Sequence, residues 1–229
     1  MKANSWGPVL AHVAGLADGF DIASGGELAL VRAAGIDPAL VSFAGPGKRD
    51  WELEAAIGAG VTLNLESEGE ARRALAIAER AGTTPRLAVR ANPDFDLRGS
   101  GMKMGGGARP FGIDAERVPA LARELIAARC EWRGLHIFAG SQALDAEALI
   151  AAQGATFELA DRLAQETGAP LPALNLGGGF GIPYFAGDKP LDVARVGAAL
   201  AERCANLPDT LAGAELAIEL GRYLVGEAG

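Results

Sequence analysis

Three consecutive glycines and a nearby arginine give the C-terminal part of this chain the residue types that bind phosphate. The segment "LNLGGGFGIP" places glycines at 177–179 directly after an apolar run, and glycine lets backbone N–H groups turn toward an anion without interference from a Cβ atom. The segment "ELGR" adds Glu219 and Arg222, and an arginine can bind two phosphate oxygens at once. The alternatives are a tight glycine turn without a ligand and a surface arginine at the start of a helix.

Other polar residues stand at the ends of apolar runs earlier in the chain. Because side chains at the carboxyl ends of parallel barrel strands meet at one face, such residues can form a common site. The interiors of the runs stay aliphatic, and this layout is typical of a site for a phosphorylated, partly aromatic small molecule. These residues are Lys2, Asp21 to Ser24, Gly45 to Lys48, Glu66, Arg90, His136, Phe138, Gly140 and Ser141.

The elements that must position these residues alternate along the chain. Short β-rich runs are separated by amphipathic segments in which apolar residues recur at i, i+3 and i+4. Strands that alternate with helices predict a parallel sheet and an α/β fold. The predicted strands span 20–24, 41–45, 62–67, 86–92, 134–140, 173–179 and 215–221, with 1–4 as the stub of an eighth. An eight-stranded barrel is therefore our first choice, and a doubly wound open sheet is the second.

Local signals predict two helix starts and one loop. Ser24-x-x-Glu27 and Ser67-x-x-Glu70 have the spacing of capping boxes, so we interpret Glu27 as structural. The segment 93–110 is rich in glycine and has no periodicity, which is typical of a mobile loop at an active site.

Composition argues against several classes of protein. The 229 residues fit one large domain, and 49% of them are apolar, enough for a sizeable core. The net charge of −8 argues against nucleic acid or an anionic membrane as the main partner, and no apolar run approaches the roughly 18 residues that span a bilayer. We expect that "MKANSW" is not the start of a signal peptide, because no apolar stretch follows it, and Cys130 and Cys204 do not support a disulfide framework or a zinc site. We expect a reducing, cytoplasmic location.

The order of five motifs resembles a known family. The motifs are "KAN", "GFDIASGGEL", "GLHIFAGSQ", "LNLGGGFGIPY" and "ELGRYLVGEAG". Together they are similar to the pyridoxal-phosphate-dependent decarboxylases of the alanine-racemase-like fold, which include diaminopimelate, ornithine and arginine decarboxylases. The third and fifth motifs look most like the diaminopimelate-decarboxylase-like branch associated with exosortase and exopolysaccharide loci. The resemblance implies a (β/α)8 TIM-type barrel, with most of its first strand missing, that binds pyridoxal 5′-phosphate.

The resemblance implies catalytic roles for two residues. Lys2 would be the Schiff-base lysine, since an amine beside a phosphate-bound aldehyde can form an imine and partial desolvation favours its attack. Glu219 would face the pyridine nitrogen and keep it protonated. Without the other motifs, Lys2 would be a solvated terminal lysine, and Glu219 a capping or ion-paired glutamate.

The resemblance also implies a set of cofactor-binding residues and no metal site. Arg90 would orient Glu219 or the phenolic oxygen of the cofactor, or would form only a salt bridge at the barrel mouth. Asp21 would be an acid near the cofactor, or would form a buried ion pair with Lys48 or Arg90. Glycines 177–179, Ser141 and Arg222 would hold the phosphate. The full set is Lys2, Asp21, Arg90, His136, Phe138, Ser141, Gly177, Gly178, Gly179, Glu219, Leu220, Gly221 and Arg222.

The sequence departs from the family pattern at several positions. Phe138 stands where a histidine usually stacks on the cofactor ring, and phenylalanine can stack but cannot form a hydrogen bond through its ring. His136 is on the same side of the predicted strand, one layer deeper, which is more typical of a core histidine. Pro110, next to Arg109, replaces a usual lysine, and Leu220 stands where proline is commonest. These differences concern the identity of the substrate more than cofactor binding.

Residues 1–229 are expected to form one pyridoxal-phosphate-binding barrel domain. In the family, an upstream segment supplies most of the first strand, and a C-terminal β-domain completes the site of the partner subunit in a dimer. We find no match to either in this chain. The isolated chain is therefore expected to bind the cofactor weakly and to decarboxylate amino acids poorly, because the groups that orient the substrate are missing.

The implied function is decarboxylation of an amino acid, diaminopimelate or another basic or diamino acid, by a homodimer. One alternative is a non-catalytic carrier of pyridoxal phosphate with the same barrel. A second is an amino-acid racemase of the same fold, against which Asn4 and Trp6 argue because racemases usually carry a different motif there. A third is an unrelated phosphate-binding barrel without a Schiff base.

Overall fold

A curled parallel sheet forms the centre of the molecule in the computed structural model, which describes residues 1–97, 99, 101–103 and 110–228. Each strand of the sheet pairs in parallel with the next one along the path. In order, these strands are β1 (Phe20–Ile22), β2 (Val41–Phe43), β3 (Thr62–Leu65), β4 (Arg86–Asn92), β7 (Glu131–Ile137), β9 (Ala173–Asn175) and β10 (Glu215–Ala217). All seven correspond to the strands predicted from the sequence, and the parallel α/β fold is confirmed.

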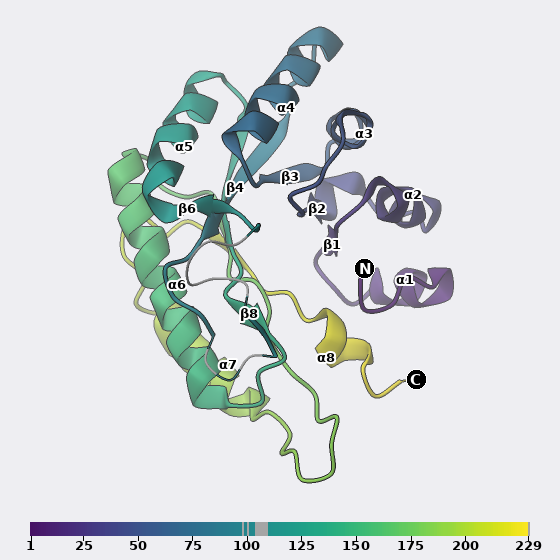
Figure 1. Ribbon diagram of the computed structural model, residues 1–229, viewed down its shortest axis with the longest axis vertical. Coiled ribbons are helices and arrows are strands. Elements are labelled where there is room, and N and C mark those ends of the chain that lie inside the picture. Colours follow the sequence, from purple (N-terminus) through teal and green to yellow (C-terminus); the bar gives the residue numbers. More distant parts are fainter. Residues whose placement is uncertain (98, 100, 104–109, 229) are drawn as a thin grey trace.

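Helices cover the outer face of this sheet, as in the outer ring of a barrel (Figure 1). The α-helices are α1 (Gly7–Val13), α2 (Gly25–Ala33), α3 (Asp50–Ala59), α4 (Glu68–Ala81), α5 (Val118–Ala127), α6 (Ala146–Thr167), α7 (Val193–Cys204) and α8 (Gly221–Val225). The short 3-10 helices η1 (Pro38–Leu40) and η2 (Ala115–Arg117) lie in the connections. Because helices separate the strands of the parallel sheet, the carboxyl ends of these strands lie on one face.

Both predicted helix starts form as expected. The Oγ atom of Ser24 accepts a hydrogen bond from the backbone N–H of Glu27 (3.2 Å), and Ser67 accepts one from Glu70 (3.1 Å). These bonds satisfy N–H groups that a helix leaves unpaired in its first turn. The glutamates bond back, to the N–H groups of Ala23 and Glu66 respectively, and so fix the angle at which each strand enters its helix.

The hydrophobic core lies between the sheet and its helices. The strand residues Phe43, Leu63, Leu87 and Leu174 are fully buried and face apolar residues of the helix layer, such as Leu163 in α6. Burial of one such side chain contributes roughly 1.5–3 kcal/mol. A smaller cluster, which includes Leu97, Leu149 and Phe180, fills the space under the loops at the carboxyl ends of the strands.

The sheet begins at β1 and ends at β10, and the described residues show no pairing between these two strands. The structure is thus an open barrel, which fits the prediction of a barrel that lacks most of its first strand. The prediction that residues 1–4 continue as a strand stub is wrong. They form a turn in which the N–H of Asn4 bonds to the carbonyl of Met1 (3.1 Å), while the terminal ammonium of Met1 donates to the carbonyl of Asp21 (3.2 Å). These two bonds use backbone groups that a strand would need for pairing.

The segment 93–110 is only partly described, and Arg109 lies outside the described residues. Two positions of the predicted loop have regular structure instead, since β5 (Met102–Lys103) pairs antiparallel with β8 (Gly140–Ser141), while the mobility of the segment stays a prediction. Leu97 is also almost fully buried. After the segment, β6 (Ile113–Asp114) extends the edge of β4. No helix in the described part of the chain is long and apolar enough to cross a membrane.

Candidate cofactor site at the carboxyl ends of the strands

Side chains from three neighbouring strands converge on the carboxylate of Glu219. His136 of β7 lies opposite Asn175 of β9 in the sheet register, and Glu219 follows β10 by two residues. The Nε2 atom of His136 lies 3.0 Å from Oε1 of Glu219, and Nδ2 of Asn175 donates to the same oxygen at 3.0 Å. Asn175 was not among the residues predicted from the sequence, although its position two residues before three glycines was an available signal.

Electrostatics favour the ionised form of Glu219. Burial alone would raise the pKa of this carboxyl, but His136, Asn175 and Arg90 outweigh burial and lower the pKa below its usual value. A carboxylate that stays ionised in a partly enclosed site can pair with a protonated ring nitrogen.

His136 is buried, as expected of a core histidine, but its ring nitrogens lack the hydrogen-bond partners that a core histidine usually has. Neither ring nitrogen makes a hydrogen bond of good geometry within the described chain, although Nε2 is within ion-pair distance of Glu219. Phe138 meets the His136 ring edge-on, with the ring centroids 6.3 Å apart, and is itself only half-buried. Phe138 is therefore the ring available for stacking, while His136 contacts Glu219.

The glycine segment is shaped by close backbone contacts. Gly177 and Gly179 have φ values of +68° and +107°, and a Cβ atom on Gly178 would overlap the carbonyl oxygen of Glu219. These contacts and φ values explain why glycine is required at these positions whether or not an anion binds there. The backbone N–H groups of Gly178 and Gly179 nevertheless donate to no acceptor among the described residues, which leaves two donors available for an anion.

Arg222 faces the loop after β8 without a carboxylate partner in the described part of the chain. Its Nη1 donates to Oε1 of Gln142 (3.0 Å), and its guanidinium lies 5.9 Å from the ring centroid of Tyr184. Gln142 has a φ of +61° and also binds the backbone of Ile182 with both ends of its amide. A positive φ is uncommon outside glycine, and this conformation marks Gln142 as a residue of the site that was not predicted from the sequence.

The remaining members of the C-terminal turn lie beside this arginine. Leu220 packs partly against the smaller apolar cluster, and a Cβ on Gly221 would lie 3.5 Å from Cβ of Ala3. The last contact places the N-terminal turn next to α8, across the opening of the barrel (Figure 1). Ser141 lies in β8, whose backbone is held by β5.

Lys2 is exposed in the N-terminal turn, close enough to Asp21 for its charge to act on that carboxyl. Oδ1 of Asp21 accepts a hydrogen bond from the hydroxyl of Ser42 (2.8 Å). Burial and the nearby carboxylate of Glu219 raise the pKa of Asp21 well above its usual value, despite the opposing effects of Ser42 and Lys2. The N-terminus thus approaches Glu219 from the side of β1.

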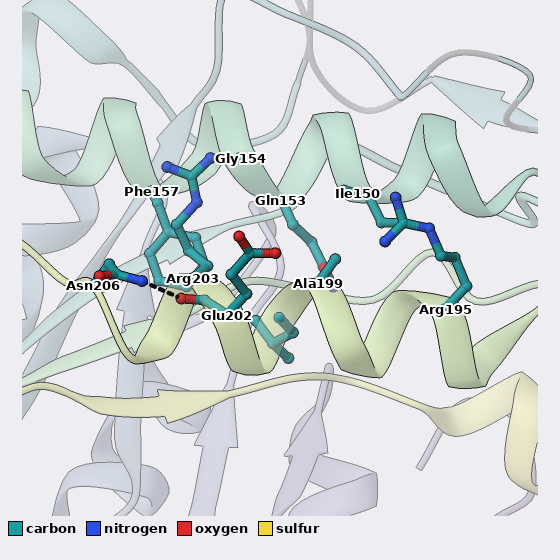
Figure 2. Close-up of a pocket in the computed structure, with 10 residues that line it drawn as sticks. Ile150, Gln153, Gly154, Phe157, Arg195, Ala199, Glu202, Arg203 and Asn206 are labelled. Carbon is teal, nitrogen blue, oxygen red and sulfur yellow. Dashed lines mark hydrogen bonds between the residues drawn. The ribbon is translucent and has the colours of Figure 1, made fainter.

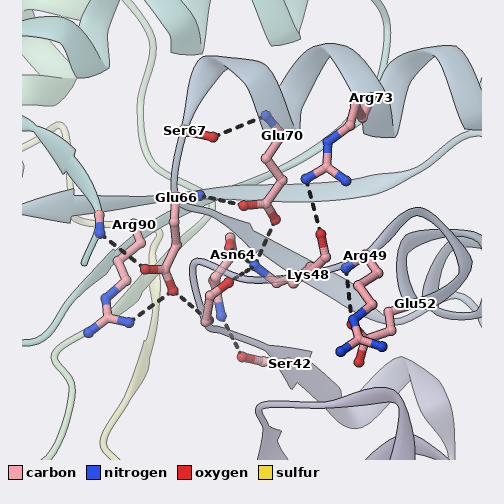
Figure 3. Close-up of polar contacts among 12 residues, drawn as sticks. Ser42, Lys48, Arg49, Glu52, Asn64, Glu66, Ser67, Glu70, Arg73 and Arg90 are labelled. Atoms are coloured by element: carbon pink, nitrogen blue, oxygen red, sulfur yellow. Dashed lines mark hydrogen bonds and ion pairs between the residues drawn. The ribbon is translucent and has the colours of Figure 1, made fainter. Parts of the chain in front are cut away.

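The predicted ion pair of Asp21 with Lys48 or Arg90 is wrong, because both cations have other partners (Figure 3). Nη1 of Arg90 lies 2.9 Å from Oε1 of Glu66, so Arg90 forms a salt bridge, while its role toward Glu219 or the cofactor stays a prediction. Nζ of Lys48 lies 2.7 Å from Oε1 of Glu70. These partners are nearer because β3 and its helix lie between β2 and β4 in the sheet.

Glu66 joins several loops of the site. Besides Arg90, its carboxylate accepts hydrogen bonds from the N–H groups of Gly45 (2.5 Å) and Gly112 (3.1 Å). Burial would raise its pKa, but Arg90, Lys48 and the Gly45 N–H lower it. The guanidinium of Arg90 also lies 5.9 Å from the ring centroid of Phe138. This network holds Arg90 at the edge of the Glu219 group.

One cavity of the structure lies away from these residues. It has a volume of about 360 Å³ and lies between α6 and α7 on the outer layer (Figure 2). Its lining includes Gln153, Phe157 and Arg203 but none of the predicted site residues. No cluster of three or more His, Cys, Asp or Glu side chains in the described residues could hold a metal ion.

The residues at the strand ends fit pyridoxal phosphate. Glu219 supplies an ionised carboxylate for the ring nitrogen, and Phe138 a partly exposed ring for stacking. Arg222 and the N–H groups of Gly178 and Gly179 supply unpaired donors for a phosphate. The amine of Lys2 lies on the same side of the barrel as Asp21.

Comparison with known proteins agrees with this fit. A family model described as "Pyridoxal-dependent decarboxylase, pyridoxal binding domain" matches residues 1–226. The chain is similar to the L-glutamyl-[BtrI acyl-carrier protein] decarboxylase of Niallia circulans, with 34% identity over 92% of this chain and 50% of that protein. It is also similar to the diaminopimelate decarboxylase of Neisseria meningitidis serogroup A, with 39% identity over 100% of this chain and 55% of the other.

Solved structures show the same fold. The diaminopimelate decarboxylase of Helicobacter pylori, complexed with L-lysine, has a TM-score of 0.80 at 28% identity and matches 95% of this chain and 54% of its own. The chain therefore spans about half the length of the curated relatives and solved structures it matches. Because the family model covers nearly all of it, the chain belongs to the pyridoxal-dependent decarboxylase family and comprises its pyridoxal binding domain.

Proposed function

We propose that this chain is the cofactor-binding barrel of an amino-acid decarboxylase whose substrate is diaminopimelate or another basic or diamino acid. The proposal rests on the arrangement of the residues around Glu219. An ionised carboxylate, held by His136 and Asn175, lies beside a glycine segment with two unpaired N–H donors. A ring nitrogen and a phosphate could be bound there together.

Each residue of the site has a distinct role in this proposal. Glu219 would pair with the ring nitrogen, and Phe138 would stack on the ring face. Arg222, with the N–H groups of Gly178 and Gly179, would bind the phosphate. The remaining residues from the sequence analysis, Ser141, Leu220 and Gly221, would line the phosphate end of the site. When bound, pyridoxal phosphate supplies an electron sink for the electron pair released as the substrate carboxylate leaves as CO₂.

Lys2 would supply the amine that binds the cofactor, and Asp21 would hold a proton beside this amine. The amine of Lys2 would bind the cofactor covalently, since its position near Asp21 brings it to the open side of the barrel. Because its pKa is raised, the carboxyl of Asp21 can hold a proton beside this amine, while Oδ1 stays bonded to Ser42. Arg90, fixed by Glu66, would add positive charge at the edge of the site.

The family match favours decarboxylation over racemisation. A diamino substrate is supported by the relatives named as diaminopimelate decarboxylases in Neisseria meningitidis and by the Helicobacter pylori decarboxylase solved with L-lysine. Their greater length also supports a further domain in the whole protein. We propose a barrel domain over residues 1–229, a homodimeric whole protein and a cytoplasmic location.

The test combines cofactor binding with CO₂ release. The purified chain is mixed with pyridoxal phosphate, and the absorbance spectrum is compared with that of Lys2→Ala. Release of CO₂ from diaminopimelate, lysine, ornithine and arginine is then measured with both proteins. We expect a Lys2-dependent spectral change and slow, Lys2-dependent release from at least one diamino acid. Binding without any Lys2-dependent release would favour the carrier alternative, and the absence of binding would overturn the proposal.

A further inference from the structure

Asn175 connects two parts of the site, Gly177 and Glu219, that lie 42 residues apart in the sequence. It is the last residue of β9, between the strands that carry His136 and Glu219. Its Nδ2 donates to Oε1 of Glu219 (3.0 Å), and its Oδ1 accepts from the backbone N–H of Gly177 (2.8 Å). The N–H of Glu219 in turn donates to the carbonyl of Gly177 (2.8 Å). Three hydrogen bonds thus form a closed ring through Asn175, Gly177 and Glu219.

This ring permits only one orientation of the Asn175 amide. If the amide turned over, its oxygen would face the Glu219 carboxylate and its NH₂ group would face the Gly177 N–H. Both contacts would then be repulsive, because a carboxylate only accepts and a backbone N–H only donates. The side chain is therefore locked from both ends, and it can transmit the position of the glycine segment to the carboxylate.

We propose that Asn175 is a positioning residue that orients the Glu219 carboxylate and couples it to the Gly177–Gly179 segment. The inference rests on the proposed function only in one respect, namely that a ring nitrogen binds at Glu219 and a phosphate binds at the glycine segment. Since His136 and Asn175 both approach Oε1, the second carboxylate oxygen is left to face the ring nitrogen. Because the Gly177 N–H is already used by Asn175, the phosphate donors are those of Gly178 and Gly179.

The Asn175 bond also acts on the charge of Glu219. The other charged or titratable groups that act on this carboxyl or are acted on by it are His136 of β7, Arg90 of β4 and Asp21 of β1. His136 and Arg90 favour ionisation of Glu219, while Glu219 in turn raises the pKa of Asp21. Loss of the Asn175 bond removes one of the effects that lower the pKa of Glu219. A hydrogen bond to a charged group of typical strength corresponds to a shift of about one to two pH units.

The decisive experiment is a pH titration of Glu219 in the protein without cofactor. Carbon-13 NMR follows the glutamate carboxyl groups, and Glu219→Gln identifies the signal. Asn175→Leu, which keeps the volume of the side chain but removes both bonds, should raise the pKa of Glu219 by about one to two units. Asn206→Leu, at an exposed asparagine beyond α7, is the matched control and should leave the titration unchanged. Equal titration of Glu219 in wild type and Asn175→Leu would overturn the proposal.

A second measurement follows the glycine segment. The dissociation constant of pyridoxal phosphate should rise about tenfold in Asn175→Leu and remain unchanged in Asn206→Leu. If Asn175→Leu does not fold, Asn175→Ser, whose short hydroxyl does not span both partners, is titrated in its place with the same expectation. If wild type does not bind pyridoxal phosphate, the proposed function fails while the titration still decides the role of Asn175. An unchanged dissociation constant in a folded variant would contradict the coupling to the glycine segment.

Discussion

The ammonium group of Lys48 lies 2.7 Å from Oε1 of Glu70, and the two side chains are only 1% and 2% exposed. Carbonyl oxygens of Gly45 and Asn64, each 2.8 Å away, satisfy the remaining donors of Lys48 (Figure 3). Burial raises the pKa of Glu70 even though Lys48 opposes the shift. Two buried charges therefore stabilise one another at the base of the site.

Lys48→Met should lower the free energy of unfolding by about 3–5 kcal/mol, because it leaves Glu70 buried without a counter-charge. The measurement is urea unfolding followed by circular dichroism. Arg195→Met removes an exposed ion pair with Glu147 and should cost less than about 1 kcal/mol. The double variant Lys48→Met, Glu70→Gln should recover part of the loss. Similar losses in Lys48→Met and Arg195→Met would contradict this account.

Lys2 should carry the cofactor. Borohydride reduction of the protein with bound pyridoxal phosphate, followed by peptide mapping, should place the pyridoxyl label on Lys2. Lys48 should remain unlabelled because its ammonium is buried and fully bonded. A label on Lys48 or Lys103 would show that the assignment of Lys2 is wrong.

Arg222→Met should weaken binding of pyridoxal phosphate about 10- to 100-fold, since one charge-assisted phosphate contact contributes roughly 1.5–3 kcal/mol. Glu219→Gln should weaken binding less, because it acts on the ring nitrogen rather than on the phosphate. Both dissociation constants can be measured by absorbance titration, with Arg195→Met as the control on the outer layer. An affinity of Arg222→Met equal to that of wild type would exclude Arg222 from the phosphate site.

Asp21→Asn should stabilise the protein without cofactor at neutral pH. A carboxyl whose pKa is raised in the folded state contributes stability while it is protonated, below its unfolded pKa, and that contribution is lost as pH rises through the folded pKa. At pH 7 the wild type therefore bears a penalty that the amide removes, whereas near pH 3 the two proteins should be similar. Urea unfolding at both pH values checks this, with the exposed Asp18→Asn as control. A variant less stable than wild type at pH 7 would contradict the raised pKa.

The two cysteines should differ in reactivity. Burial raises the pKa of Cys130 to about 11, so little thiolate is present at neutral pH, whereas Cys204 is exposed at the end of α7. A maleimide at pH 7.5 should modify Cys204 first, and Cys130 only slowly or after unfolding. Mass spectrometry of peptides after short reaction times measures both rates. Faster modification of Cys130 would be inconsistent with its burial.

Local sequence determined the elements and the type of fold. Each apolar run that was predicted as a strand forms one, and Ser24 and Ser67 begin helices, because these signals depend on residues within one turn or one strand. The boundaries were less accurate. The strand predicted over 173–179 ends at Asn175, because Gly177 and Gly179 adopt positive φ values that lie outside the β region.

The partners of the site residues were decided only by the tertiary structure. Arg90 binds Glu66 rather than Asp21, and His136 and Asn175 meet at Glu219, because the order and register of the strands bring these side chains together. Neither the Arg90–Glu66 contact nor the contacts at Glu219 can be predicted from spacing along the chain, because the residues in contact belong to different βα units. The sequence by itself thus determined which residue types stand at the strand ends and, through its motifs, the family. The packing of the strands determined which of those residues touch, since hydrogen bonds of about 3 Å depend on the relative position of neighbouring strands.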